Sequence, residues 1–266
     1  MHEFKLIDKY FSKLSKKNKS SLNLNDDVFF DKSKKLVISV DTYTQGIHFV
    51  DFKKPDLVIK KIIRSSISDL ICKGVKPKYY FISGSGNKKT FSNSNLRKIS
   101  NSLNQEQKKY KILLAGGDTV QSNKLSFTIT SLGFSKKIIF RNKAQLNDDI
   151  YVTSNLGDSY VGLKILRKDI YTNQKLKKYF ISKYYLPNLH LNLADKLLSI
   201  ANTSIDISDG LITDLEKLIN KQKLTYKLFF EKIPLSNNLK KLIRLNKLQK
   251  KNYLSKGDDY QILFTA

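Results

Sequence analysis

The spacing of apolar residues predicts that helices and strands alternate along the chain. The broadest apolar helical face falls in residues 55–73, where Pro55 suits a first turn. Residues 3–15 show a weaker helical pattern, and we expect that helix to pack on the core. A polar helix is predicted over 93–109. In the second half, helices are predicted over 157–167 and from Pro187 to about residue 201.

Short apolar or alternating runs predict the strands. They cover residues 36–40, 79–82, 112–115, 125–130, 150–153 and 262–264, and a further strand is expected within 224–254. Several of these runs alternate between apolar and polar residues instead of being apolar throughout. This pattern favours an α+β fold over a doubly wound parallel sheet.

A basic, polar stretch around residues 135–145 separates the two halves of this pattern. It predicts an N-terminal α+β domain over residues 1–136 and a C-terminal α+β domain over residues 137–266.

Aspartates gather where the predicted strands or apolar segments end. They are Asp26 with Asp27, Asp41, Asp69, Asp118, Asp206 with Asp209, and Asp258 with Asp259. One aspartate at such a place is usually a turn residue or a helix cap, but the repeated arrangement suggests that several converge. Converging carboxylates repel one another and need cations, and all-oxygen ligands suit Mg²⁺ with a phosphate substrate. The pattern therefore indicates phosphoryl transfer from a metal-bound nucleotide.

The segment Leu113–Thr119 illustrates this design best. An apolar run predicts a buried strand, and Gly116 and Gly117 allow a sharp turn directly before Asp118. Bare backbone N–H groups beside a carboxylate suit a nucleotide phosphate whose charge is shared with a metal.

Composition and charge argue against several other classes of protein. The net charge is +26, but only five of the 49 basic residues are arginine, and the lysines are spread over nearly every polar segment. Sequence-specific nucleic-acid binding normally concentrates its charge and uses arginine, so we expect no specific nucleic-acid partner. No apolar run is long enough to span a membrane, and the single cysteine, Cys72, allows no internal disulfide, as in a cytoplasmic protein.

The common phosphoryl-transfer motifs are missing. Lys89-Thr90 lacks the glycine that precedes the lysine of a Walker-type loop, and the signature segments of protein kinases are absent. With three histidines in the chain, a histidine-rich metal site is excluded as well.

The acidic motifs and their order resemble the thiamine-monophosphate kinase family. The matching segments are Phe4-x-x-Ile7 with Phe11, Asn25-Asp26-Asp27, Ser39–Thr42 with Gly46-x-His48-Phe49, Ser68-Asp69-Leu70, Gly116–Thr119, Asp206–Leu211 and Gly257–Tyr260. The resemblance implies two α/β-sandwich-type domains like those of aminoimidazole ribonucleotide synthetase, usually in a homodimer, with the acidic site at the domain junction. It also implies ATP-dependent phosphorylation of thiamine monophosphate to thiamine diphosphate.

The resemblance assigns roles to individual residues. Mg²⁺ ions would be held by Asp27, Asp41, Asp69, Asp118, Asp206 and Asp209. ATP would contact Gly117, Asp118, Arg141, Ser208 and Tyr110, and thiamine monophosphate would contact His48 and Asp258. No residue is expected to react covalently, because the transfer needs in-line positioning and neutralised charge.

The chain departs from the family pattern in ways that keep other functions open. Asp258 replaces a glutamate, Lys256 a glycine and Asn25 another glycine, and the chain stops at Ala266 where relatives continue. We therefore expect the C-terminal domain to lack a final segment that helps to cover the substrate. The alternatives are a related ATP-dependent synthetase with another substrate, a truncated inactive homologue, and a polyanion-binding protein.

Overall fold

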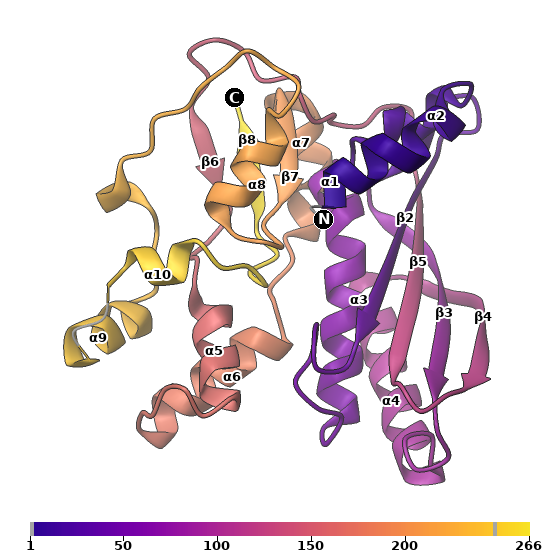
Figure 1. The fold of residues 1–266 in the computed structure, drawn as a ribbon, viewed down its shortest axis with the longest axis vertical. Coiled ribbons are helices and arrows are strands. Elements are labelled where there is room, and N and C mark those ends of the chain that lie inside the picture. The colour runs from indigo at the N-terminus through magenta and orange to yellow at the C-terminus, as the bar shows by residue number, and fades with distance from the viewer. Residues whose placement is uncertain (1–2, 247–248) are drawn as a thin grey trace.

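The computed structural model describes residues 3–246 and 249–266, and Figure 1 shows the arrangement of the helices and strands. The strands are β1 (Phe29–Asp31), β2 (Leu36–Thr44), β3 (Pro77–Gly86), β4 (Leu113–Gln121), β5 (Ser126–Phe134), β6 (Ile150–Val152), β7 (Thr203–Asp206) and β8 (Ile262–Thr265). The longer helices are α3 (Pro55–Cys72), α4 (Asn93–Tyr110), α5 (Asp158–Leu166), α6 (Gln174–Tyr185), α7 (Ala194–Ile200), α8 (Leu211–Leu218) and α9 (Asn237–Asn246). Short helical segments are α1 (Glu3–Leu6), η1 (Ile7–Phe11), α2 (Ser12–Ser15), η2 (Lys19–Leu24), η3 (Leu191–Leu193), η4 (Phe230–Lys232) and α10 (Lys251–Leu254).

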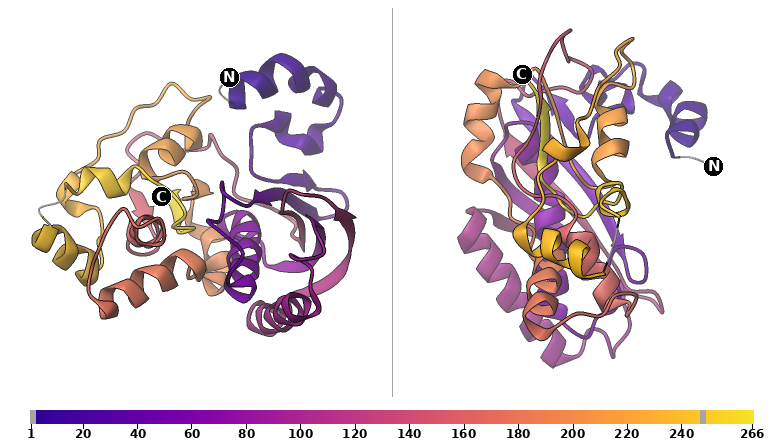
Figure 2. Two further views of the ribbon diagram at one scale, coloured as in Figure 1. Left: turned by 60° about the horizontal axis from the view of Figure 1, so that its bottom comes forward. Right: turned by 90° about the vertical axis from the view of Figure 1, so that its left-hand side faces the viewer.

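The first sheet has five strands in the order β1-β2-β5-β3-β4. β3 and β4 run parallel, while the other neighbouring pairs are antiparallel. The sheet is strongly curved, and helices α3 and α4 pack against its concave face (Figure 2). The apolar side of α3 predicted from the sequence is almost entirely buried there, which is the main reason this half of the chain folds around it.

The second sheet has three antiparallel strands in the order β6-β8-β7. Figure 1 shows it beside α3, with β7 close to the end of that helix. The core around α3 includes Tyr184 of α6, Leu197 of α7 and Ile262 of β8. One helix therefore contributes to the packing of both sheets, and the α+β fold class is confirmed. The predicted domain division after residue 136 lies between the end of β5 and the start of β6.

The structure corrects the prediction of a turn at Gly116-Gly117-Asp118. These residues lie inside β4, which continues to Gln121. The register between β3 and β4 shifts at Tyr80 and Phe81, and a Cβ atom on Gly117 would lie 1.8 Å from the Ile82 carbonyl oxygen. The glycines are therefore needed for the close approach of two parallel strands rather than for a chain reversal. Asp41 likewise lies within β2 and does not end it.

Other sequence-based assignments also differ from the structure. Residues 3–15 are helical, but the five residues of η1 form a π-helix, and Leu14 is 81% exposed. The prediction that this helix packs on the core was wrong. Pro187 does not open a helix, since α7 begins only at Ala194, and residues 83–86 extend β3 where a loop was expected. Among the described residues of 224–254 there is no strand.

No helix in residues 3–246 or 249–266 is long and apolar enough to cross a membrane.

Candidate active site

A cleft of about 650 Å³ lies where α3 meets the second sheet. Its walls include nine of the residues predicted to form the site: Asp27, Asp41, His48, Asp69, Arg141, Asp206, Ser208, Asp209 and Asp258. These positions come from β2, α3, β7, the segment just before β1, and the loops that follow β2, β5, β7 and α10. The structure thus brings together side chains that are distant in sequence, and most of them are acidic.

Three carboxylates form the centre of this cleft. The Ser39 hydroxyl group lies 2.5 Å from an oxygen of Asp69 and 3.4 Å from an oxygen of Asp41. The hydroxyl group of Ser68 donates to Asp206. No lysine, arginine or histidine within the described part of the chain forms an ion pair with Asp41, Asp69 or Asp206. Asp206 is buried, Asp41 and Asp69 are half-buried, and all three have hydroxyl groups as hydrogen-bond donors.

Burial of these carboxylates has a clear electrostatic consequence. Desolvation raises the pKa of Asp41 to about 6 and that of Asp206 to about 6. Desolvation, followed by repulsion from Asp41 and Asp206, raises the pKa of Asp69 well above its ordinary value. The charged forms of all three side chains are thus disfavoured until a cation neutralises them.

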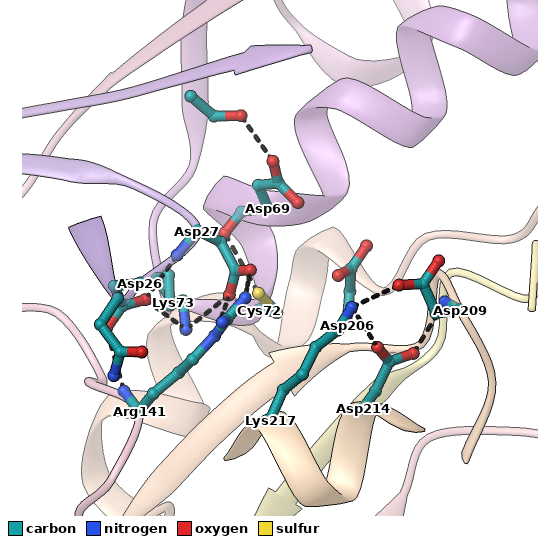
Figure 3. A network of polar contacts seen from close by, with 12 residues as sticks. Asp26, Asp27, Asp69, Cys72, Lys73, Arg141, Asp206, Asp209, Asp214 and Lys217 are labelled. Atoms are coloured by element: carbon teal, nitrogen blue, oxygen red, sulfur yellow. Dashed lines mark hydrogen bonds and ion pairs between the residues drawn. The ribbon is translucent and has the colours of Figure 1, made fainter. Parts of the chain in front are cut away.

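A second acidic pair, Asp26 and Asp27, is neutralised by the protein (Figure 3). The ammonium group of Lys73 lies 2.7 Å from an Asp26 oxygen and 2.9 Å from an Asp27 oxygen. The guanidinium group of Arg141 also pairs with Asp27, and its Nε donates to it over 3.1 Å. Two cations therefore face two carboxylates at this end of the cleft.

A third group surrounds the start of α8. Lys217 lies 2.5 Å from an oxygen of Asp209 and 3.0 Å from an oxygen of Asp214 (Figure 3). The backbone N–H groups of Asp209 and Gly210 both donate to Asp214, which holds this loop against the helix. On the other side, a Cβ atom on Gly257 would lie 1.7 Å from the Ser208 carbonyl oxygen, so only glycine permits this contact.

The opposite end of the cleft contains His48 and Asp258. The backbone N–H of Thr44 donates to Nδ1 of His48 over 2.9 Å, so the neutral imidazole carries its proton on Nε2. Lys61 is fully buried, and its ammonium group lies 2.9 Å from Asp258 and 3.5 Å from the ring centroid of Tyr184. Partial burial lowers the pKa of His48, which keeps the ring neutral near pH 7.

Three predicted site residues lie elsewhere in this chain. Gly117 and Asp118 are in β4, and Asp118 is exposed with a carboxylate oxygen accepting from the Thr119 N–H. Tyr110 ends α4, where its ring is buried beneath the guanidinium group of Arg64. None of the three lines the cleft, so their predicted contacts with ATP, and the predicted role of Asp118 as a metal ligand, stay predictions.

Sequence reasoning did not assign roles to three buried or half-buried lysines, Lys61, Lys73 and Lys217. Two of them had a detectable pattern, because Lys61, Ser65, Asp69 and Lys73 follow one another at intervals of four residues. Such spacing places side chains on one face of a helix. The position of Asp69 therefore indicated that Lys61 and Lys73 lie on the same side of the helix.

The central carboxylates fit a metal ion on chemical grounds. They offer hard oxygen ligands, they are buried or half-buried, and they form no ion pair with a protein cation among the described residues. No three acidic, histidine or cysteine side chains of residues 3–246 and 249–266 converge closely enough to complete a metal site alone. An ion that takes its remaining ligands from water and a nucleotide phosphate, as Mg²⁺ usually does, suits this incomplete set.

Comparisons with known proteins identify relatives of this chain. Residues 25–135 match the family model described as AIR synthase related protein, N-terminal domain. The thiamine-monophosphate kinase of Buchnera aphidicola subsp. Acyrthosiphon pisum is 35% identical over 99% of this chain and 82% of its own length. The corresponding protein of Haemophilus influenzae is 34% identical, over 100% of this chain and 81% of its own length.

Solved structures show the same likeness. The structure of AaThiL complexed with AMPPCP and TMP superimposes with a TM-score of 0.90 and 28% identity, covering 99% of this chain and 84% of the other. Thiamine monophosphate kinase from Aquifex aeolicus gives a TM-score of 0.86 at 28% identity, covering 100% of this chain and 89% of the other. The chain belongs to the thiamine-monophosphate kinase family.

Proposed function

We propose that this protein transfers the γ-phosphoryl group of ATP to thiamine monophosphate and so forms thiamine diphosphate. A phosphate oxygen of the acceptor forms a bond to the γ-phosphorus, the bond from that phosphorus to the β–γ bridging oxygen breaks, and ADP leaves. The observation that carries the proposal is the central set of carboxylates, half-buried Asp41 and Asp69 with buried Asp206, in a cleft that a nucleotide can enter. Family membership and the nucleotide analogue and TMP held by AaThiL support it.

Mg²⁺ is the cation that this arrangement suits best. Asp41, Asp69 and Asp206 would hold it, with Asp209 beside them at the start of α8. When bound, the ion would neutralise the phosphate charge that increases during transfer. Carboxylates alone would repel a triphosphate, so the cation is also needed for nucleotide binding.

The remaining charged residues position the two substrates. Arg141, Ser208 and Lys217 line the cleft near the acidic centre, where they can bind the phosphates of ATP. His48 can donate from Nε2 to an oxygen of thiamine monophosphate at the other end. Asp258 is fixed by Lys61 and by the Tyr260 hydroxyl group, which donates to it over 3.1 Å. The shorter side chain at position 258 is thus held in a defined place.

We propose a homodimer as the working form. The convex face of the five-stranded sheet is uncovered and carries exposed apolar side chains, among them Val40, Phe81, Val120 and Phe134. A second copy that packs on this face would bury them. It would also bring another chain to β4, which gives Gly117 and Asp118 access to a nucleotide that they cannot reach within their own chain. The division into domains 1–136 and 137–266 remains part of the same proposal.

An assay with purified protein tests this function. We expect ATP, Mg²⁺ and thiamine monophosphate to yield ADP and thiamine diphosphate in equal amounts, measured by chromatography. The Asp69→Asn variant is the matched control, because it removes one central charge and keeps nearly the same shape. Turnover of ATP with aminoimidazole precursors instead would favour the related synthetase. Binding of RNA or DNA that ignores Mg²⁺ and ATP would favour a polyanion-binding protein.

A further inference from the structure

The acidic residues of the cleft fall into two sets that differ in how their charge is balanced. Asp41, Asp69 and Asp206 have hydroxyl groups as their nearest donors. Asp26 and Asp27 instead face two protein cations, Lys73 and Arg141. Figure 3 shows Asp69 and Asp206 of the first set together with the second set, in which Lys73 lies between the two carboxylates.

Each carboxylate oxygen of Asp26 and Asp27 already has a donor. Lys73 reaches one oxygen of each residue, at 2.7 Å and 2.9 Å. The backbone N–H of Arg141 donates to the other oxygen of Asp26 over 3.0 Å, and its guanidinium group contacts both oxygens of Asp27. This pair therefore lacks the bare oxygen atoms that the central carboxylates offer to a metal ion.

Lys73 is held firmly in this position. Its side chain has no exposed surface, and its ammonium group also donates to the carbonyl oxygen of Ser204 on β7 over 2.7 Å. Its three donors thus meet three oxygens, two of them charged. Burial alone would lower the pKa of Lys73, but the nearby Asp26 reverses this effect and raises it, so the amine stays charged.

We propose that Lys73 is a built-in cation that takes the place of a metal ion between Asp26 and Asp27. The inference rests on the proposed function, because it concerns how the same site balances its charge. It confines metal binding to the Asp41, Asp69 and Asp206 side of the cleft. The sequence-based assignment of Asp27 as a metal ligand is replaced by an ion pair with Lys73 and Arg141.

The cleft would therefore use two kinds of cation: an ammonium group that is a permanent part of the protein, and metal ions that exchange with solvent. A covalently attached ammonium group keeps this end of the cleft neutral at any Mg²⁺ concentration. Metal ions are then required only where the carboxylates lack a protein partner. The number of ions that the protein binds should therefore depend on whether residue 73 is charged.

Mn²⁺ binding measured by electron paramagnetic resonance tests this inference without nucleotide or turnover. Lys73→Met removes the charge and keeps a long, flexible side chain, and we expect it to bind one more Mn²⁺ per chain than the wild type. Mn²⁺ should also raise its melting temperature more than that of the wild type. Lys73→Arg keeps the charge and is the matched control, with the wild-type count expected. An unchanged count in Lys73→Met would overturn the proposal.

A second variant covers the case in which Lys73→Met does not fold. Asp27→Asn should leave the Mn²⁺ count of the wild type unchanged, because Asp27 is neutralised by protein groups. Loss of one ion in Asp27→Asn would show that Asp27 is a metal ligand and that the inference is wrong. Neither result depends on the substrate, so a failed kinase assay and a failed metal count remain distinguishable.

Discussion

The hydroxyl group of Ser68 donates a hydrogen bond to the carboxylate of Asp206, although 138 positions separate the two residues in the chain. Ser68 belongs to α3, on the side of the five-stranded sheet, whereas Asp206 ends β7 of the second sheet. The bond links the two halves of the molecule at the cleft. Because Asp69 follows Ser68 directly, the same link fixes the spacing of two central carboxylates.

Replacing one central carboxylate tests its role in catalysis. Asp206→Asn keeps an acceptor for Ser68 but loses the charge, so we expect kcat/KM to fall by about 100-fold or more. In the absence of metal, the Asp206→Asn variant should melt at a higher temperature than the wild type, because a buried charge has been removed. Asp195→Asn is the control, since the Asp195 side chain is 68% exposed and pairs with a surface lysine. Near-normal turnover of Asp206→Asn would remove Asp206 from the site.

The stability of the metal-free protein should depend on pH through the central carboxylates. The pKa of Asp41 and that of Asp206 are each raised by burial from 3.8 to about 6. Between pH 4 and pH 6 the unfolded chain therefore binds fewer protons at these groups than the folded chain. The free energy of unfolding must then fall as pH rises through this window.

Urea unfolding at several pH values measures this effect. The free energy of unfolding of the wild type minus that of Asp206→Asn should fall from pH 4 to pH 6 and then stay constant. Saturating Mg²⁺ should reduce the loss of wild-type stability near pH 6, because the ion binds the charged carboxylates. A difference that increases with pH would contradict the assignment of Asp206 as a buried, unpaired acid.

His48 is expected to act on the acceptor substrate. His48→Ala removes the Nε2–H donor, so the KM for thiamine monophosphate should rise about 10-fold while the KM for ATP changes little. His48→Gln retains an N–H donor, so its KM for thiamine monophosphate should rise less than that of His48→Ala. Steady-state kinetics with each substrate varied in turn give both values. A larger effect on ATP than on thiamine monophosphate would place His48 at the nucleotide instead.

The convex sheet face is expected to be buried in a homodimer. Val40 is 62% exposed on this face, and Val40→Glu would place a charge in an apolar contact. We expect this variant to be monomeric under conditions where the wild type is dimeric, as measured by light scattering. Tyr171→Glu, at a residue that is 79% exposed in the second half of the chain, should keep the wild-type mass. A monomeric wild type would contradict the proposed dimer directly.

Asp118 gives a separate test of a shared site. Asp118→Asn should lower turnover at least as much as Asp69→Asn if Asp118 faces the nucleotide of a second copy. Mixing the two inactive variants should then restore roughly a quarter of wild-type activity, because half of the random dimers contain one intact site. Full activity of Asp118→Asn alone would end its assignment to the site.

Most residues of the cleft could be predicted from the sequence because each lies in a short segment with a recognisable pattern. Asp69 stands out on the apolar side of a helix, and the Asp206–Leu211 segment is acidic and glycine-bounded. The α+β class also followed from alternating strands. Resemblance to a family assigned the roles, whereas the physical pattern indicated only phosphoryl transfer with a metal.

The missed features depend on distant partners. Nothing near Lys73 in the sequence shows that it faces Asp26, since the two residues are 47 positions apart and the pairing requires the folded core. Asp118 was expected at a turn because two glycines usually reverse the chain, yet here they allow β3 and β4 to approach closely. The N-terminal helix was expected to be buried because apolar spacing predicts a face but does not say what covers it.

Helix α3 connects the two ends of the cleft. Lys61 lies beside the proposed acceptor pocket, Asp69 at the metal centre and Lys73 at the helix end, spaced over roughly 18 Å along one rigid rod. A helix of this kind does not shorten. The distance between Lys61 at the acceptor end of the cleft and Asp69 at the proposed metal site is therefore set by the number of residues between them. Any adjustment to a longer or shorter acceptor must come from the loops of β7 and α10 that approach this rod from the other side. The distances between these three side chains are thus set by a single stretch of backbone.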